Sequence, residues 1–283
     1  MKEFNKYRLT RETIKEYEKH LRSEDYAPDT IKKYIRDLRK FCTWMDGQLL
    51  QKELATEWRD HLFNVGYAPV TVNSMLAALN GYLRFCGLAW KVKFLRIQRQ
   101  IFRDPNRELI QSEYMNLVVE ARRLGRTRLA LIMETVCATG IRVSEVKYIT
   151  VESVQKGRAE IRLKGKIRSI LLPGKLCKKL FKYIKKEKIT FGEIFLTKGK
   201  KRISRQQIWA EMKRLCATAK VESTKVFPHN LRHLFARTFY RIYRDIVRLA
   251  DTLGHSSIET TRIYLRSTDI EYRKKLERLG LIS

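Results

Sequence analysis

The sequence predicts a mainly α-helical protein of two domains that carries one small antiparallel β-sheet. Apolar residues recur at helical spacing through residues 9–88 and through several segments of the second half. Between residues 149 and 172 the pattern changes to short runs of leucine and β-branched residues, which Gly157 and Gly165 interrupt. A chain of 283 residues is long enough to bury two separate hydrophobic cores.

The first 88 residues are expected to form four helices, and part of their sequence is repeated. Residues 26–31 (YAPDTI) recur as residues 67–72 (YAPVTV), and in both copies a proline stands at the expected start of a helix. Proline suits that position because the N–H that it lacks would have no partner within the helix. Two related helix pairs predict one compact four-helix domain, with helices over residues 11–20, 28–45, 54–65 and 69–85.

A basic segment, residues 89–106, follows this domain and ends in the turn signal Asp104-Pro105-Asn106. It is predicted to be a linker, so that residues 1–88 form the first domain and residues 107–283 the second. Helices of the second domain are predicted near residues 111–124, 127–138, 174–187 and 204–219. Strands are predicted over residues 149–153, 159–163 and 168–172, the last two joined by a tight turn at Lys164-Gly165-Lys166.

The charge of the chain points to a polyanionic partner. Sixty Lys and Arg residues against thirty Asp and Glu residues give a net charge of +30, and the larger share of this excess falls after residue 105. A field of this size attracts nucleic acid, which is therefore the expected partner. The alternative, a lysine-rich surface that only holds water, does not by itself explain so large an excess.

Other features of composition bear on the compartment. No apolar run reaches the length of a transmembrane helix, and the first ten residues lack the apolar region of a signal peptide. The five cysteines are odd in number and show no CxxC spacing, which is typical of reduced thiols. These observations predict a cytoplasmic protein.

The string ATGIRVSE, residues 138–145, is expected to end one helix and begin another. Gly140 permits a sharp turn, which would turn Arg142 out of the helix. Ser144 or Glu145 would then begin the next helix. An arginine presented at such a turn is a candidate for binding an anion.

Three histidines and a tyrosine gather in residues 229–264. His229, Arg232 and His233 share one face of a helix that Pro228 begins. A second helix is predicted over residues 245–253, and Gly254 closes it. A third helix, capped by Ser256 or Ser257, is expected to carry Thr260, Thr261 and Tyr264. His255 lies between the second and third helices.

This set of side chains suits phosphoryl transfer without a metal. A phosphodiester gains negative charge on its non-bridging oxygens in the transition state, which arginine forks and imidazoles can neutralise. A tyrosine hydroxyl can serve as the covalent nucleophile. A zinc protease would need glutamate after His229, and Asn230 stands there instead, so no metal site is expected.

The spaced motifs HNLRH (residues 229–233), LGH (253–255) and TTRIY (260–264), together with ATGIRVSE upstream, resemble the tyrosine recombinase, or phage-type integrase, family. The resemblance implies an N-terminal four-helix core-binding (SAM-like) domain and an α+β catalytic domain. It also implies that the catalytic residues are Arg142, Lys164, His229, Arg232, His255 and Tyr264.

The lysine is assigned by resemblance alone. In this family a β-hairpin carries a lysine that acts as the general acid, and the Gly-Lys-Gly turn of the family aligns with Lys164. This sequence has Leu163 where that pattern has its first glycine. Lys166 is therefore the alternative position for the catalytic lysine.

The family's activity implies cutting of double-stranded DNA at a specific site, a 3′-phosphotyrosyl bond to Tyr264, and no cofactor. Strands would be exchanged in a tetramer of this chain, alone or with a second recombinase. A tail helix from near Asp269 would dock on a neighbour through Leu276, Leu279, Leu281 and Ile282. The Xer type, which resolves chromosome or plasmid multimers, is the nearest by architecture. The alternatives are a transposon or phage integrase or resolvase, a type IB topoisomerase, and a DNA-binding regulator that does not cut.

Overall fold

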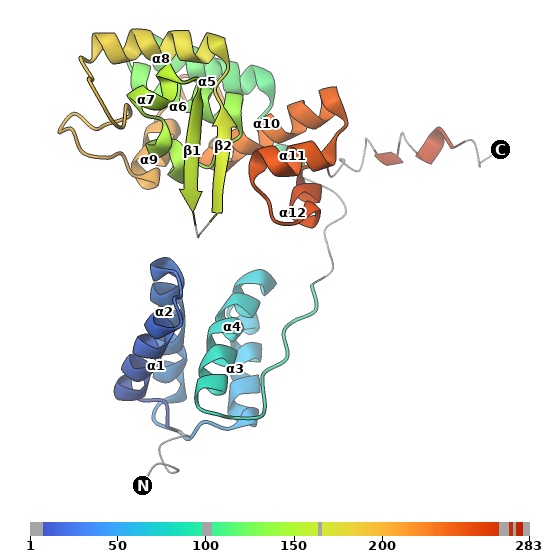
Figure 1. The fold of residues 1–283 in the computed structure, drawn as a ribbon. Coiled ribbons are helices and arrows are strands. Elements are labelled where there is room, and N and C mark those ends of the chain that lie inside the picture. The colour runs from blue at the N-terminus through green and yellow to red at the C-terminus, as the bar shows by residue number, and fades with distance from the viewer. Residues whose placement is uncertain (1–7, 98–103, 164–165, 266–271, 274–275, 280–283) are drawn as a thin grey trace. The chain divides into compact units, whose positions relative to one another are not determined.

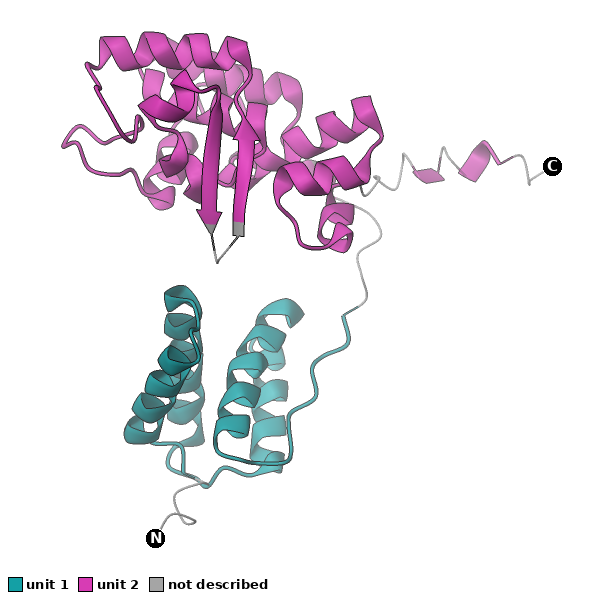
Figure 2. Ribbon diagram, in the orientation of Figure 1, with its two compact units in different colours: residues 1–99 teal, residues 100–283 magenta. Residues whose placement is uncertain are grey.

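The computed structural model describes residues 8–97, 104–163, 166–265, 272–273 and 276–279. The chain forms two compact units, residues 1–99 and 100–283 (Figure 2). Helices dominate the described residues, and one two-stranded antiparallel sheet accompanies them (Figure 1). The predicted fold class is confirmed. Within the described ranges, every helix is too short or too polar to cross a membrane.

Unit 1 is a bundle of four helices, as the sequence predicts. These are α1 (Arg11–Ser23), α2 (Pro28–Met45), α3 (Lys52–Asn64) and α4 (Pro69–Phe85). Helix α2 lies at the centre, where it packs against the other three. The core holds the apolar side chains that recur at helical spacing, so the amphipathic pattern alone determines which face of each helix is buried.

The internal repeat produces the same local geometry twice. Ala27 and Ala68 precede the two prolines with φ of −58° in both cases and ψ of 138° and 140°. Proline restricts the residue before it to this extended region. Equivalent repeat positions are also buried in the same core, as the pairs Ile31 and Val72, Leu38 and Leu79, and Phe41 and Tyr82 show.

Unit 2 is built around helix α6 (Thr127–Thr139), which is buried on nearly all sides. It contacts α5 (Gln111–Arg123), α8 (Gly174–Lys186), α9 (Arg205–Lys213) and α10 (Pro228–Tyr243). Two shorter helices, α11 (Ile246–Leu253) and α12 (Ile258–Arg262), follow α10 and pack on each other. Two segments of 3-10 helix complete this region. The first, η2 (Val143–Tyr148), follows the turn after α6, and the second, η4 (Ile263–Leu265), follows α12.

The sheet is a hairpin of β1 (Arg158–Leu163) and β2 (Lys166–Leu171). Its register runs from Arg158 opposite Leu171 to Leu163 opposite Lys166. Ala159, Ile161 and Ile170 on one face enter the core, whereas Ile167 and Leu171 on the other face are exposed. The two strands were predicted within two residues, and the turn residues Lys164 and Gly165 lie outside the described residues.

The prediction of a further strand over residues 149–153 is wrong. Thr150 makes a single bridge with Glu193, and the chain then enters the short helix α7 (Val151–Gln155). The hydroxyl of Thr150 accepts from the Ser153 N–H at 3.1 Å, and the Ser153 hydroxyl accepts from the Thr150 N–H at 2.8 Å. This reciprocal cap starts a helix despite the β-branched residues that indicated a strand. The helix predicted over 204–219 also ends early, at Lys213.

Gly140 has the left-handed conformation that the sequence predicts, with φ of 67°. A Cβ there would lie 2.4 Å from Cδ1 of Phe235. We therefore expect Gly140→Ala to lower the free energy of unfolding by about 2–4 kcal/mol, from left-handed strain and overpacking together. Gly157→Ala is the matched control, because Gly157 has φ of 64° with nothing within 4 Å. Chemical denaturation of both variants measures the difference, and equal losses would contradict the packing contribution.

Candidate active site

Arg142 is presented at the turn that Gly140 makes after α6. Its N–H donates to Oε2 of Glu145 at 2.7 Å, and its Nη1 donates to Oε1 of the same carboxylate at 3.0 Å. The Arg142 side chain is 37% exposed, so the rest of its guanidinium fork is accessible. The sequence predicted an α-helix from Ser144 or Glu145, whereas the chain forms η2, which begins directly after Arg142.

Helix α10 carries the HNLRH motif, and Asn230 fixes its first turn. The side-chain amide of Asn230 donates to the carbonyl oxygens of Arg107 and Lys225, both at 2.7 Å. The predicted shared face is confirmed by the rings of His229 and His233, whose centroids lie 4.5 Å apart, edge to face. Asparagine at position 230 therefore anchors the helix by two bonds that glutamate, which has no N–H to donate, would not make.

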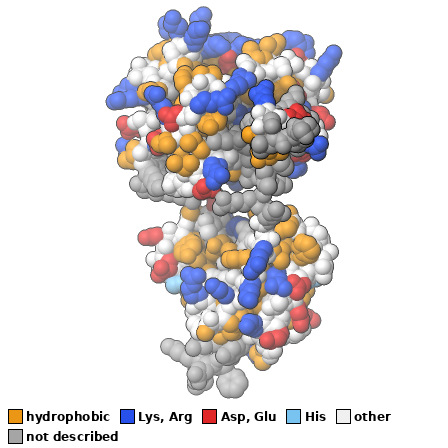
Figure 3. Space-filling model, turned by 90° about the vertical axis from the view of Figure 1, so that its right-hand side faces the viewer, with side chains coloured by type: hydrophobic (Ala, Val, Ile, Leu, Met, Phe, Trp, Pro, Cys, Tyr) orange, Lys and Arg blue, Asp and Glu red, His pale blue; other side chains and the backbone are white. Residues whose placement is uncertain are grey.

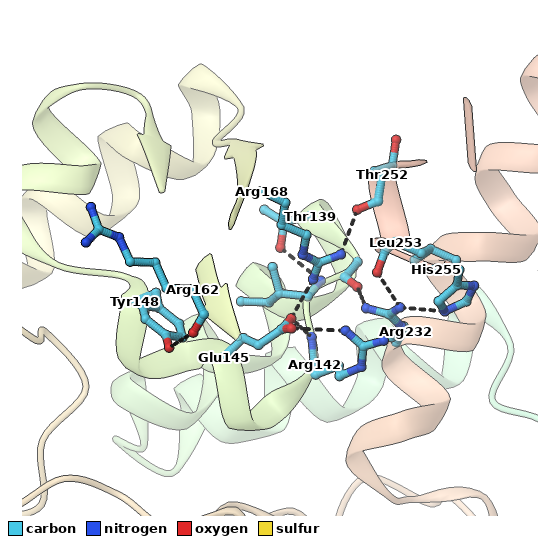
Figure 4. A network of polar contacts seen from close by, with 12 residues as sticks. Thr139, Arg142, Glu145, Tyr148, Arg162, Arg168, Arg232, Thr252, Leu253 and His255 are labelled. Atoms are coloured by element: carbon cyan, nitrogen blue, oxygen red, sulfur yellow. Dashed lines mark hydrogen bonds and ion pairs between the residues drawn. The ribbon is translucent and has the colours of Figure 1, made fainter. Parts of the chain in front are cut away.

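Arg232 is almost completely buried, with 1% of its surface exposed. It donates to the carbonyl oxygens of Gly140 at 2.6 Å and Leu253 at 2.7 Å, and to Nε2 of His255 at 2.8 Å. One side chain thus joins α10, the turn after α6 and the end of α11 (Figure 4). Its buried Nε has no acceptor among the described residues.

The electrostatics around Arg232 favour an anion. Burial lowers the pKa of the Arg232 guanidinium, and the Tyr264 hydroxyl, which interacts with it, acts in the opposite direction. Arg142 lies close enough to lower that pKa further by repulsion. Two arginines that repel each other and an unused buried donor are stabilised when a negatively charged group binds between them.

His255 is held in one tautomer. A guanidinium can only donate, so Nε2 of His255 accepts from Arg232, and the ring proton sits on Nδ1. Nδ1 then donates to the buried hydroxyl of Thr261 at 2.9 Å. Burial, together with the charges of Arg232, Arg142 and Arg168, lowers the pKa of His255 to about 4. The ring is therefore neutral near pH 7.

Tyr264 lies in η4, two residues after Arg262, the last residue of α12. It is therefore not within the third helix, where the sequence predicted it. Its side chain is only 4% exposed and packs with Ala236, Leu249 and Leu253 in a small cluster of its own. The ring meets His233 edge to face at 4.6 Å and lies nearly parallel to His255 at 5.8 Å. The tyrosine is thus surrounded by the site and largely shielded from solvent.

Sequence reasoning named His233 but gave it no role. It lies between His229 and Tyr264, and its burial, followed by the charges of His229, Arg237 and Arg232, lowers its pKa to about 3. His229 is more exposed, and desolvation followed by the charges of Arg232 and Arg142 lowers its pKa as well. The spacing of His233, four residues after His229, was the signal that placed it on the same face.

Glu145 and Arg168 form a buried ion pair beside Arg142 that the sequence did not reveal (Figure 4). Glu145 is 1% exposed, and Nη2 of Arg168 donates to its Oε2 at 2.6 Å. The sequence marks Glu145 only as a possible start of a helix. The available signal for Arg168 was its place two residues before the buried Ile170, which predicts an arginine on the inner face of the strand.

The structure brings together five of the six predicted catalytic residues: Arg142, His229, Arg232, His255 and Tyr264. Lys164, the sixth, lies outside the described residues, and the alternative Lys166 is the first residue of β2. Within the described ranges, no group of three His, Cys, Asp or Glu residues is placed to hold a metal ion.

The lowered histidine pKa values predict how stability depends on pH. Unfolded histidine titrates near pH 6.5, whereas the pKa values of His233 and His255 are about 3 and 4 in the fold. The unfolded chain therefore binds more protons below pH 6.5, and the free energy of unfolding should fall as the pH decreases from 7 towards 4. Thermal unfolding at stepped pH measures this. His233→Phe, which keeps an aromatic ring, should flatten the slope, and an unchanged slope would contradict the assignment.

Comparisons with known proteins identify the family of the chain. The sequence profile described as "Phage integrase family" matches residues 108–271, more than half of the chain, and "Phage integrase, N-terminal SAM-like domain" matches residues 14–88. The chain therefore belongs to the phage integrase family. It is a tyrosine recombinase, an enzyme that recombines DNA.

Several relatives cover nearly the whole chain. Tyrosine recombinase XerA of Thermococcus kodakarensis is 30% identical over 282 residues, with 96% of both chains covered. XerA of Pyrococcus furiosus is 29% identical, with 97% and 96% covered. Among solved structures, a lambda integrase dimer bound to a COC' core site has a TM-score of 0.70 at 17% identity and covers 91% of this chain and 95% of its own. XerH bound to palindromic difH substrate also reaches 0.70, at 18% identity, with 89% and 79% covered. At such identities the structures show a common fold.

Proposed function

We propose that this chain cuts and rejoins double-stranded DNA at a specific site through a 3′-phosphotyrosyl bond to Tyr264. The observation that carries this proposal is the convergence of Arg142, Arg232 and neutral His255 on one buried tyrosine. Two arginines supply the charge that a phosphodiester needs, and the tyrosine supplies an oxygen nucleophile.

The proposed reaction is a transesterification. The hydroxyl of Tyr264 loses its proton to water, and its oxygen attacks the scissile phosphorus to form a phosphotyrosyl bond, while the bond to the 5′ oxygen of the next nucleotide breaks. A lysine, Lys164 or alternatively Lys166, protonates the leaving 5′ oxygen. Arg142 and Arg232 neutralise the non-bridging oxygens, where charge develops. The free 5′-hydroxyl of a partner strand reverses the same steps, so one phosphodiester is exchanged for another without ATP.

His255 has a positioning role in this scheme. Its Nε2 accepts from Nη2 of Arg232, and its Nδ1 is fixed by Thr261. The imidazole therefore holds one arm of the guanidinium, whereas Nε of Arg232 has no acceptor among the residues that the structure describes. That buried N–H is the group that we assign to a phosphate oxygen.

Tyr264 must become more accessible before it can attack. Its side chain is 4% exposed and packs in the small cluster with Ala236 and Leu249. Helix α12, which precedes it, has only five residues, so a shift of this segment disrupts few backbone bonds. DNA binding therefore has to draw the tyrosine towards the phosphate, and cleavage should follow binding as a separate step.

We assign residues 1–88 to a core-binding DNA domain, 89–106 to a basic linker, and 107–283 to the catalytic domain with its tail. The matched SAM-like segment and the excess of positive charge support this division. On the face that Figure 3 shows, Lys and Arg side chains are prominent on both units. Most of the tail, including Asp269, Leu281 and Ile282, lies outside the described residues, and the described Leu276 and Leu279 are exposed.

We propose assembly into a tetramer on two recombination sites, of this chain alone or with a second recombinase. The support is a related lambda integrase structure that forms a tetramer bound to a Holliday junction. The names of the curated relatives favour an Xer-type recombinase. We propose that it acts in the cytoplasm and resolves chromosome or plasmid multimers. A Tn1549 transposon integrase with a TM-score of 0.68 supports a mobile-element enzyme as the second candidate.

A plasmid that carries two copies of the target site tests the proposal. Selection of bound sequences with the purified protein first supplies that site. A recombinase should yield two smaller circles or an inverted segment. Relaxed plasmid without recombinants would indicate a type IB topoisomerase, and binding without any strand cleavage would indicate a regulator.

The same reaction should proceed at an unchanged rate in excess EDTA. The nucleophile, the charge neutralisation and the general acid in the proposed scheme are all protein side chains, so no step needs a divalent cation. The rate of covalent adduct formation, with and without EDTA, is the measurement. Loss of cleavage that magnesium restores would overturn this part of the proposal.

A further inference from the structure

Arg168 occupies an unusual place for a charged residue. It lies opposite Ile161 in the hairpin, on the face whose neighbours Ala159 and Ile170 enter the core. Its side chain is 17% exposed, and burial lowers the pKa of its guanidinium. A cation on the inner face of a strand requires partners that compensate the loss of water.

Those partners belong to two different parts of the candidate site. Nη2 of Arg168 donates to Oε2 of Glu145 at 2.6 Å, and Nη1 donates to the carbonyl oxygen of Thr252 at 3.2 Å. Glu145 in turn holds Arg142, and Thr252 lies at the end of α11, three residues before His255. Figure 4 shows Arg168 between these two groups, pointing towards both.

The chain makes room for this contact at Gly254. A Cβ on Gly254 would lie 2.4 Å from Nη1 and 2.6 Å from Cδ of Arg168. The turn that presents His255 therefore packs directly on the arginine side chain. Gly254 also has φ of 65°, so its conformation and its lack of a side chain both serve this turn.

Arg168 also determines how Glu145 is shared. Oε2 of Glu145 accepts from the Arg142 N–H and from Arg168, whereas Oε1 accepts from Nη1 of Arg142. With Arg168 present, only one nitrogen of the Arg142 fork, Nη1, donates to the carboxylate. Without Arg168, a carboxylate that is 1% exposed would keep Arg142 as its only cation in this network, and would draw the fork towards itself.

We propose that Arg168 is a positioning residue for cleavage. It braces Arg142 and the turn before His255 in one geometry, and it offsets the charge of Glu145 so that the Arg142 fork stays available to phosphate. This inference rests on the proposed function, because it assigns a role in the same reaction. It adds a residue of the hairpin that acts through Arg142 and the turn before His255.

The test is single-turnover cleavage of a suicide substrate at saturating DNA, with half-site affinity and thermal unfolding measured on the same proteins. Arg168→Ala should cleave on the order of 10²-fold more slowly, the loss typical of a misplaced catalytic group, while its half-site Kd stays near that of the wild type. Arg162→Ala is the matched control. It removes the same charge from the same hairpin, but its side chain is 72% exposed and should leave the cleavage rate unchanged.

A second variant separates positioning from general loss of structure. Arg168→Ala combined with Glu145→Gln removes the carboxylate charge that would draw the Arg142 fork, and should cleave faster than Arg168→Ala alone. A purely structural role predicts the opposite, because a second buried bond is weakened. Arg168→Lys should recover part of the rate, since lysine can reach one partner but lacks the fork for both.

The outcomes distinguish the two proposals. A wild-type protein that forms no adduct through Tyr264 would overturn the proposed function itself. A wild type that cleaves, with Arg168→Ala cleaving equally fast, would overturn only the role of Arg168. If Arg168→Ala is unfolded, the comparison passes to Arg168→Lys, and a folded Arg168→Lys that cleaves as fast as the wild type would equally refute the role of Arg168.

Discussion

Tyr264→Phe is expected to bind DNA as the wild type does and to form no covalent adduct. The substitution removes only the hydroxyl, whereas the ring contacts with His233 and His255 and the packing against Leu249 persist. The fold and the phosphate-binding arginines should therefore remain in place. Without the oxygen nucleophile no phosphotyrosyl bond can form, so the expected loss is complete.

The measurement is a nicked suicide substrate incubated with each protein and separated on a denaturing gel. Wild-type protein should give a band of protein joined to DNA, and Tyr264→Phe none. Tyr243→Phe is a suitable control, because Tyr243 is the last residue of α10 and has 61% of its surface exposed. A shifted band with Tyr264→Phe would show that another residue is the nucleophile.

Replacement of Arg232 by lysine should reduce cleavage on the order of 10²-fold or more, comparable to the loss of one oxyanion donor. Lysine keeps the positive charge, but a single ammonium cannot replace a planar fork that joins Gly140, Leu253 and His255. Lysine also lacks the Nε that has no acceptor in the described part of the chain and that we assign to the phosphate.

Arg142→Lys provides the informative comparison. Both variants should cleave poorly, but only Arg232→Lys should also lower the melting temperature by several degrees. Arg232 is 1% exposed and holds three segments together, whereas the Arg142 side chain is 37% exposed and contacts one carboxylate. Cleavage rates and thermal unfolding measured together test this. Lysine variants that cleave at the wild-type rate would refute the role of the forks.

Features that depend on a few neighbouring residues could be predicted from the sequence. Helix periodicity gave the four helices of unit 1 and their buried faces, and Pro28 and Pro69 marked two helix starts. Gly140 and Gly254 predicted left-handed turns, which the structure has. Where local signals competed, as at Thr150, a cap formed a helix against the strand propensity of the residues that follow.

The candidate site itself followed from spaced motifs, but its geometry did not. The sequence by itself determined that Arg142, His229, Arg232, His255 and Tyr264 are the residues with suitable chemistry. Only the tertiary structure decided that Arg232 is buried, that Tyr264 is shielded by His233, and that Arg168 reaches Thr252 from another element. The physical reason is the distance along the chain over which each effect acts. Periodicity and capping act within about one turn of helix or one hairpin, whereas these contacts form only when the core of unit 2 brings distant segments together.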